Sequence, residues 1–356
     1  MPDLGTLMTT LLEEAKAGLG LGGDEGSHRL AEIEEFGTNP GRLRMLAFVP
    51  TALPPGAPLV VVLHGCMQNA AGYDHGAGWS ALAERFGFAL LYPEQRRVNN
   101  AQGCFNWFRP EDTARGQGEA ESIRQMAGHM LAEHGLDRGR VFVTGLSAGG
   151  AMAAALLGAY PEVFAAGAII AGLPAGGAAS ATEAMEEMQA GKPRSARAWG
   201  ELVRRASPHR GPWPAVQIWH GEADHTVNPL NAEALVLQWT DVHGVGDAAP
   251  QEDWVSGVPH RVWRDRSGRV SVETYRVAGL GHGTPIGPHA AEAEQRGGVA
   301  GPFMLDCDVA STWLIARSWG LLGRERAVRA EAPLAAPGTS DGTISKVLRT
   351  MGLLED

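Results

Sequence analysis

Val141-Phe-Val-Thr-Gly145-Leu-Ser147-Ala-Gly149-Gly150 is the stretch that decides the fold. Its first four residues are β-branched or aromatic, which predicts a short buried strand. The residues that follow, 151–157, are strong helix formers. A strand, a Gly-x-Ser-x-Gly turn and a helix together are the context of a nucleophile elbow, which presents its serine at the carboxyl edge of a sheet. The sequence therefore predicts Ser147 as a nucleophile.

Composition limits the class of protein. The chain has 356 residues, of which 44% are hydrophobic and 20% charged, and this suits one large globular domain with appendages. A net charge of −10 at pH 7 argues against a nucleic-acid partner, because such proteins cluster Lys and Arg. No run of about 18 apolar residues exists, so no membrane span is expected. No cluster of residues has zinc-ligand spacing, so neither a metal nor a cofactor is expected.

Further apolar runs predict an α/β fold. Residues 59–63 form a continuous aliphatic run, which is typical of a strand covered on both faces. Other strands are expected at 43–49, 88–92, 164–170 and 215–219, and a late edge strand with alternating polarity at 270–277. Helices are expected at 79–85, 119–134, 231–239 and 312–321. The prediction is a mostly parallel central sheet with helices on both faces.

The chain divides where its composition changes. Residues 1–30 contain an apolar-spaced segment, 6–19, that predicts a surface helix, followed by a Gly-rich flexible link. Residues 31–323 are expected to form the catalytic domain. Within it, residues 178–212 are rich in Ala, Glu and Arg without a strand pattern, which we interpret as a helical insertion or lid. Residues 324–356 are expected to be an Ala/Pro/Gly linker and an amphipathic tail.

His64-Gly65-Cys66 directly follows the predicted strand 59–63. A Gly at this place lets the backbone turn sharply and present N–H groups to a developing oxyanion. In nucleophile-elbow enzymes one such donor comes from this loop and the other from the residue after the nucleophile. The amides of Cys66 and Ala148 are therefore the predicted oxyanion hole. His64 is an alternative base, but it precedes the nucleophile, so we interpret it as a structural loop residue.

A serine hydroxyl becomes a good nucleophile only when a base removes its proton and a carboxylate orients that base. His282 follows the strand 270–277 in a Gly-flanked loop and is the predicted base. His289 is the nearest rival, but no strand precedes it directly. A surface or loop role is favoured for five other histidines: His75, His134, His209, His243 and His260.

Asp224 is the predicted acid. It follows the strand 215–219 after a short turn, and it satisfies the chain order of nucleophile, acid and base that hydrolases of this kind require. Its carboxylate would accept a hydrogen bond from one ring nitrogen of His282, leaving the other nitrogen to face the serine. Glu222, two residues closer to the strand, and Asp241, near the end of a helix, remain alternatives.

Two loops are expected to contact substrate. Cys104-Phe-Asn-Trp107-Phe108 lies at the centre of a long loop, residues 93–118, and long loops inside compact domains are usually functional. Trp107 is the predicted substrate contact, whereas its Phe neighbours fit loop packing equally well. Leu173 is a second predicted contact, because the loop 171–177 would overhang the nucleophile.

The three cysteines allow at most one internal disulfide. Cys66 lies in the predicted oxyanion loop and Cys104 in the aromatic loop, and both loops leave the carboxyl ends of neighbouring strands. A bridge between Cys66 and Cys104, with Cys307 free, is one interpretation. Ordinary buried thiols are the other, and a reducing cytoplasm favours them.

Several segments, taken in order, resemble the polyhydroxybutyrate (PHB) depolymerase family of esterases. These segments are LHGCMQNAAGYDHGAGWSALAERFGFALLYPEQ, CFNWF, GEAESIRQM, VFVTGLSAGGAMAAALL, IIAGLP, WHGEAD and GLGHGTP, and the resemblance covers about residues 30–322. It implies an α/β-hydrolase fold and ester hydrolysis through Ser147, Asp224 and His282. The family includes short-chain polyhydroxyalkanoate depolymerases and is similar to feruloyl and acetylxylan esterases.

The resemblance implies a serine esterase that cleaves 3-hydroxybutyrate polymer or oligomers through an acyl-enzyme intermediate. A feruloyl, acetylxylan or general short-chain carboxylesterase is the alternative, and a non-catalytic binding protein on a hydrolase scaffold is a third reading. The ester substrate is the one partner expected. The resemblance also implies an extracellular enzyme, whereas residues 1–5 lack the features of a signal peptide, which makes a cytoplasmic protein the alternative.

Overall fold

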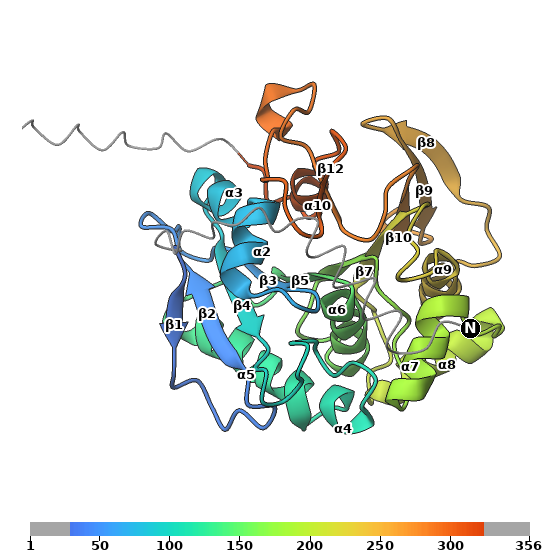
Figure 1. The fold of residues 1–356 in the computed structure, drawn as a ribbon, viewed down its shortest axis with the longest axis horizontal. Helices are drawn as coiled ribbons and strands as arrows, with labels where there is room; N and C mark the ends of the chain where they lie inside the picture. The colour runs from blue at the N-terminus through green and yellow to red at the C-terminus, as the bar shows by residue number, and fades with distance from the viewer. Residues whose placement is uncertain (1–28, 324–356) are drawn as a thin grey trace, which may run out of the picture. The chain divides into compact units, whose positions relative to one another are not determined.

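Strand β5 (Val141–Leu146) and helix α6 (Ala148–Ala159) are the centre of the fold, and a single residue separates them. All six residues of β5 and all twelve of α6 are buried, as expected for β-branched and Ala-rich sequence that other elements cover on every side. The computed structural model describes residues 29–323, and Figure 1 shows the sheet crossing this part of the chain with helices on both sides.

The described residues form one ten-stranded sheet in the order β1-β2-β4-β3-β5-β6-β7-β10-β9-β8. Apart from β5, its strands are β1 (Ala31–Ile33), β2 (Arg44–Phe48), β3 (Leu59–Leu63), β4 (Ala89–Glu94), β6 (Ala166–Ile170), β7 (Ala215–Gly221), β8 (Gln251–Val255), β9 (Val258–Arg264) and β10 (Val270–Val277). Neighbours from β4 through to β10 pair in parallel, whereas the pairs at both edges are antiparallel. The predicted mostly parallel sheet is confirmed.

Strand β10 lies inside the sheet, and the prediction of an edge strand at residues 270–277 is wrong. It pairs with β7 on one side and with β9 on the other. Its alternating polarity has another cause, because Glu273 is buried and accepts hydrogen bonds from Gln217 and His260. The sequence pattern also misses the β8–β9 hairpin that extends the sheet, since most of β8 is exposed and no buried face marks it.

Apolar side chains of the sheet alternate between two cores, one on each face. Odd-numbered residues of β3 belong to one core and even-numbered residues to the other. The first core includes side chains of α5 (Gly118–Glu133), α6, α8 (Ala196–Ala206) and α9 (Leu230–His243). The second includes side chains of α2 (Ala70–Ala77), α3 (Trp79–Phe86) and α10 (Ser311–Ser318). Helices therefore cover both faces, as Figure 1 shows.

The segment 178–212 is helical, as its composition predicts. Helix α7 (Ala181–Ala190) begins after Ser180, whose hydroxyl accepts the backbone N–H of the third helical residue, and α8 begins in the same way after Ser195. Helix α8 buries Val203 and packs against α6 and α9. Helix α8 is therefore part of the helical layer that includes α6 and α9.

The predicted helix at 6–19 and the predicted linker and tail at 324–356 lie outside the described residues. Between residues 29 and 323, no helix is long and apolar enough to cross a bilayer. In the same part of the chain, no group of three or more His, Cys, Asp or Glu side chains could hold a metal ion. The remaining elements are α4 (Pro110–Thr113), β11 (Thr284–Ile286), the 3-10 helix η1 (Ala293–Gln295) and β12 (Met304–Asp306).

Candidate active site

Ser147 occupies the turn between β5 and α6. Its φ of 58° and ψ of −118° lie in a region that residues other than Gly rarely adopt, and such strain is typical of a nucleophile elbow. The Ser147 N–H donates to the Ile170 carbonyl at 2.9 Å, which fixes the turn to the end of β6. Ser147 itself is buried, with 8% exposure, as are its neighbours in β5 and α6.

The two glycines of the elbow are required by close backbone approach. A Cβ on Gly145 would lie 2.5 Å from the backbone of Gly149. A Cβ on Gly149 would lie 2.4 Å from the carbonyl oxygen of Leu63, at the end of β3. Any side chain at either position would push α6 away from the strands, because real Cβ atoms do not approach backbone atoms so closely.

The structure brings Asp224 and His282 together from two different loops. His282 Nδ1 lies 2.8 Å from Asp224 Oδ2, while Asp224 Oδ1 accepts the N–H groups of Thr226 and Val227 at 2.9 and 2.8 Å. Burial acts to raise the pKa of Asp224, but His282 and His220 outweigh it and hold that pKa well below its usual range. An ionised carboxylate only accepts, so Nδ1 of His282 carries a proton and its Nε2 is left free.

Backbone hydrogen bonds join the loop that carries Asp224, the acid loop, to the loop that carries His282, the histidine loop. The Ala223 N–H donates to the Leu280 carbonyl at 3.0 Å, and the Glu222 N–H donates to the Val277 carbonyl at 3.0 Å. A Cβ on Gly221 would lie 2.2 Å from the Leu280 carbonyl oxygen, so this contact needs a glycine. The two loops therefore form one rigid unit that presents both side chains.

Only one of the two glycines that flank His282 is required by packing. A Cβ on Gly283 would lie 2.8 Å from a backbone carbonyl oxygen, whereas nothing lies within 4 Å of one built on Gly281. Just after the loop, Thr284 Oγ1 lies 3.1 Å from the Tyr73 hydroxyl of α2. This buried contact anchors the chain as it leaves the site.

The rival acids and bases point elsewhere. Glu222 is half exposed and lies 3.9 Å from Arg276, and Asp241 pairs with Arg204 of α8. The side chain of His289 is 78% exposed and lies 3.8 Å from an aspartate of β12. None of these three groups contacts the Asp224–His282 pair.

The Cys66 amide lies in the loop after β3 and the Ala148 amide at the start of α6, and these two parts of the chain approach closely where Gly149 meets Leu63 and His64. No described residue accepts the Cys66 N–H, and Ala148 begins α6, where N–H groups have no partner within the helix. Met67 has a φ of 61°, a left-handed conformation that turns the chain sharply after Cys66. The Gln68 side chain accepts the Gly65 N–H at 2.8 Å and holds this turn. Both amides are therefore free to bind an oxygen atom.

His64 stabilises the same loop. Its buried Nε2 accepts the Gln95 N–H at 3.1 Å, so its Nδ1 carries the proton and donates to the Gly65 carbonyl at 2.8 Å. Burial lowers the pKa of His64, which keeps the ring neutral. Because both ring nitrogens are engaged, His64 does not serve as the base.

A buried carboxyl group supports the aromatic loop, residues 93–118. Glu119, in the first turn of α5, accepts the Gln95 side-chain N–H at 2.5 Å and the Asn106 backbone N–H at 2.8 Å. Burial is the main reason why the pKa of Glu119 is raised to about 8. Since Gln95 also donates to His64, this cluster connects the aromatic loop with the oxyanion loop.

Cys66 and Cys104 form a disulfide, and Cys307 is free. The bridge joins the oxyanion loop directly to the aromatic loop that carries Trp107. It therefore limits the motion of the Cys66 amide, and a rigid donor stabilises an oxyanion better than a mobile one.

This bridge predicts one titratable thiol in the denatured, unreduced protein and three after reduction. Replacing both bridging cysteines with Ser should also lower the free energy of unfolding by about 2–4 kcal/mol, because the bridge closes a long loop in the unfolded chain. Thiol titration and urea denaturation measure the two effects. Cys307→Ser is the matched control, and it should remove the single thiol. Three thiols before reduction would contradict the bridge.

Trp107 and Leu173 belong to one apolar cluster beside the elbow. Its buried members are Cys104, Trp107, Ala148, Ala151, Leu173, Ala178, Ala184 and Val227. Trp107 packs edge-on against Phe108, with ring centroids 5.7 Å apart. Helix α7 contributes Ala184, so the inserted segment reaches the same wall. Both predicted substrate contacts therefore lie in apolar surroundings next to the residue that follows the nucleophile.

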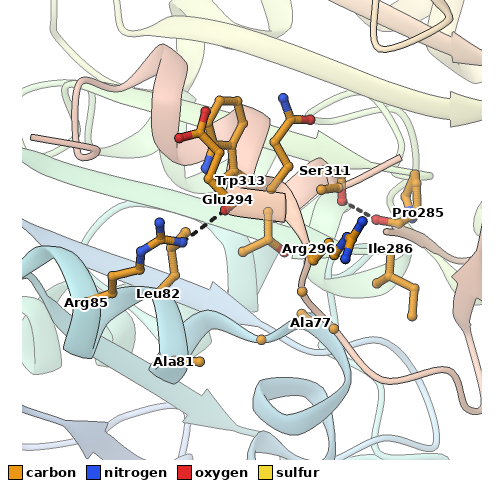
Figure 2. Close-up of a pocket in the computed structure, with 16 residues that line it drawn as sticks. Ala77, Ala81, Leu82, Arg85, Pro285, Ile286, Glu294, Arg296, Ser311 and Trp313 are labelled. Carbon is orange, nitrogen blue, oxygen red and sulfur yellow. Dashed lines mark hydrogen bonds between the residues drawn. The ribbon is translucent and has the colours of Figure 1, made fainter. Parts of the chain in front are cut away.

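A separate cavity of about 120 Å³ lies between α3, α10 and residues 285–298, and Figure 2 shows its walls. The Arg85 guanidinium donates to the Glu294 carbonyl at 3.0 Å, and the Ser311 hydroxyl donates to the Pro285 carbonyl at 2.6 Å. None of the predicted catalytic or substrate residues lines this cavity. Its hydrogen bonds hold the chain that follows the histidine loop.

Comparison with known proteins identifies the family. Residues 45–253 match the family model described as Esterase PHB depolymerase. The chain belongs to this family. This PHB depolymerase-family protein is 45% identical over 297 residues to poly(3-hydroxyalkanoate) depolymerase C of Paucimonas lemoignei, covering 83% of the chain and 71% of that protein. It is 35% identical to feruloyl esterase B of Thermothelomyces thermophilus, covering 72% of the chain and 89% of that protein.

The predicted α/β-hydrolase fold is also confirmed for this PHB depolymerase-family protein. The acetyl xylan esterase from Aspergillus awamori is similar with a TM-score of 0.66 and 28% identity, over 71% of this chain and 93% of that one. The relatives share the esterase class, so this member of the PHB depolymerase family is an ester hydrolase.

Sequence reasoning missed His220 in this PHB depolymerase-family site. The residue is the last but one of β7, and its Nε2 lies 3.4 Å from Asp224 Oδ2 and 2.8 Å from the Val227 carbonyl oxygen. A signal for it was present, because His220-Gly221 follows the predicted strand 215–219 as His64-Gly65 follows the predicted strand 59–63.

Proposed function

We propose that this protein hydrolyses 3-hydroxybutyrate esters, in polymer or oligomers, through a Ser147, His282 and Asp224 triad. The observation that carries the mechanism is the 2.8 Å contact between His282 Nδ1 and Asp224 Oδ2, in a fold that also strains Ser147 into an elbow. The 45% identity to a poly(3-hydroxyalkanoate) depolymerase supports the substrate class.

In the proposed reaction, His282 Nε2 removes the Ser147 hydroxyl proton as Oγ attacks the ester carbonyl carbon. The Cys66 and Ala148 amides bind the resulting oxyanion. The tetrahedral intermediate collapses to an acyl-enzyme, and the imidazolium passes its proton to the leaving alcohol. Water then attacks the acyl-enzyme by the same route and releases the acid. Asp224 keeps the His282 ring in the required tautomer and stabilises its charged form.

The apolar cluster that contains Trp107 and Leu173 supports the proposal of a substrate with a short acyl chain. Trp107 and Leu173 would line the acyl side, and α7, which we propose as a lid, would close the site over bound substrate. The disulfide supports an oxidising compartment for the enzyme, because such bonds persist there.

A substrate panel tests the proposed specificity. The measurement compares kcat/KM for 3-hydroxybutyrate oligomers, p-nitrophenyl esters of increasing chain length and methyl ferulate, together with product release from polymer film. We expect the oligomers and the short acyl esters to react fastest. A higher kcat/KM for methyl ferulate would favour a feruloyl esterase, the second candidate, which the 35% identity to feruloyl esterase B supports.

Asp224→Asn should lower kcat by about 10³- to 10⁴-fold, because an amide cannot stabilise the imidazolium and favours the wrong tautomer. Glu222→Gln is the matched control, since it removes a carboxylate on the same loop that does not contact His282. We expect this control to keep kcat within about twofold of the parent enzyme. A larger loss of kcat for Glu222→Gln than for Asp224→Asn would contradict the assignment of Asp224 as the acid.

A further inference from the structure

We infer that His220 is a positioning residue for Asp224, and that it sets the pH range in which His282 acts as a base. The inference rests on the proposed triad. It concerns a second imidazole that lies close to the carboxylate of the acid. The proposed reaction does not use this side chain.

The side chain of His220 is fully buried at the end of β7. Its Nε2 lies 2.8 Å from the Val227 carbonyl oxygen and 3.4 Å from Asp224 Oδ2. Asp224 Oδ2 is the oxygen that His282 Nδ1 contacts at 2.8 Å. Two imidazoles therefore approach one carboxylate oxygen, one closely and one at the edge of hydrogen-bond distance.

The hydrogen bonds fix the protonation state of His220. A carbonyl oxygen only accepts, so Nε2 carries the proton that it donates to Val227. His220 Nδ1 is buried and has no partner among the described residues. A second proton there would be a charged donor without an acceptor, which costs far more than a bare lone pair. This is the arrangement of a neutral ring, whose Nε2–H is donated to the Val227 carbonyl and lies close to Asp224 Oδ2.

This N–H has two consequences for the acid. The Val227 N–H donates to Asp224 Oδ1, and the Val227 carbonyl accepts from His220. Both backbone groups of Val227 are therefore bound, which fixes the acid loop next to Asp224. The His220 dipole also withdraws some of the negative charge that Asp224 presents to His282. Without this N–H the carboxylate would be more basic and would stabilise the imidazolium form of His282 more strongly.

The other charged groups near the acid loop are occupied with one another. Arg276 of β10 lies 3.9 Å from Glu222 of the acid loop and pairs with Glu233 of α9 at 2.6 Å. The groups that lower the pKa of Asp224 against the effect of its burial are His282 and His220. The neighbouring ion pairs therefore leave His220 as the group that tunes this carboxylate.

The test compares His220→Leu with His220→Gln. Leu fills the space but has no donor, whereas the Gln side-chain N–H can reach the place of Nε2. We expect the acid limb of kcat/KM in His220→Leu to move to higher pH by about 0.5 unit, with kcat lowered roughly tenfold. In His220→Gln the limb should stay within about 0.2 unit of the parent profile, because a donor is restored.

His243→Gln is the matched control. His243 is another largely buried histidine that bonds a backbone carbonyl, that of Pro214 at 3.0 Å, but it lies at the end of α9. Its replacement should leave the acid limb in place. An unmoved limb in His220→Leu, with equal losses for Leu and Gln, would overturn the inference and leave His220 as a packing residue.

A second measurement separates this inference from the proposed function. In the Ser147→Ala background, NMR follows the titration of the His282 ring without any turnover. The ring signals should titrate at higher pH when His220→Leu is added and should be unchanged when His243→Gln is added. An identical His282 titration curve with and without His220→Leu would refute the inference. Absence of ester hydrolysis in the wild-type enzyme would instead refute the proposed function.

Discussion

Ser147→Ala is expected to lower kcat for hydrolysis of p-nitrophenyl butyrate by about 10⁵-fold or more, since loss of a triad nucleophile removes nearly all chemical catalysis. The fold should survive, because the substitution deletes one hydroxyl from the elbow and leaves Gly145 and Gly149 in place. Enzyme kinetics measures the loss, and circular dichroism with thermal unfolding checks the fold.

Ser271→Ala is the matched control for that variant. Ser271 is a buried serine of β10. This control should keep kcat within about twofold of the parent enzyme. Retention of more than about 1% of wild-type activity by Ser147→Ala would contradict a nucleophilic role, because a triad enzyme without its nucleophile keeps far less.

His282→Ala is expected to lower kcat by about 10⁵-fold, because the serine hydroxyl then has no base and the leaving alcohol no proton donor. The Asp224 carboxylate would lose its contact with His282 but keep the Thr226 and Val227 amides, so the acid loop should keep its conformation. The measurement is single-turnover kinetics with p-nitrophenyl butyrate, which separates acylation from deacylation.

His289→Ala is the control for the base assignment. His289 lies seven residues further along the chain and is largely exposed, so its removal should leave kcat nearly unchanged. If His289→Ala lost more activity than His282→Ala, the base would be assigned to the wrong loop.

The elbow could be predicted because its signals are local. A strand, Gly-x-Ser-x-Gly and a helix are contiguous in the chain. The two glycines of this motif are needed because the backbone of strand and helix approaches them too closely for a side chain. The pairing of Asp224 with His282 is not local, and it followed from the order of nucleophile, acid and base along the chain. The structure brings these two side chains together although 58 residues separate them.

Other parts of the fold depend on partners that lie far away in the sequence. Helix α2 contains Gly72 and Gly76, which weaken a helix prediction. Gly76 is needed because a Cβ there would lie 2.5 Å from the Met304 side chain, which no local pattern can reveal. The exposed strand β8 gave no signal for the same reason, since its pairing with β9 and not its own polarity makes it a strand.

Buried polar groups were the hardest residues to assign. Glu119 has the sequence of an ordinary acidic residue in the first turn of a helix, yet it is buried under the aromatic loop and bound to Gln95 and Asn106. His220 has the sequence of a strand end, yet it lies against the acid. In both cases tertiary packing supplies the partners, so single-sequence patterns leave the role open.

Covalent labelling tests the central claim most directly. A p-nitrophenyl alkylphosphonate reacts with an activated serine and cannot be released by water at an appreciable rate, so the labelled residue is the nucleophile. Peptide mapping by mass spectrometry should find the adduct on Ser147, in step with loss of esterase activity. An adduct on any other residue, or full loss of activity with Ser147 unlabelled, would contradict the account.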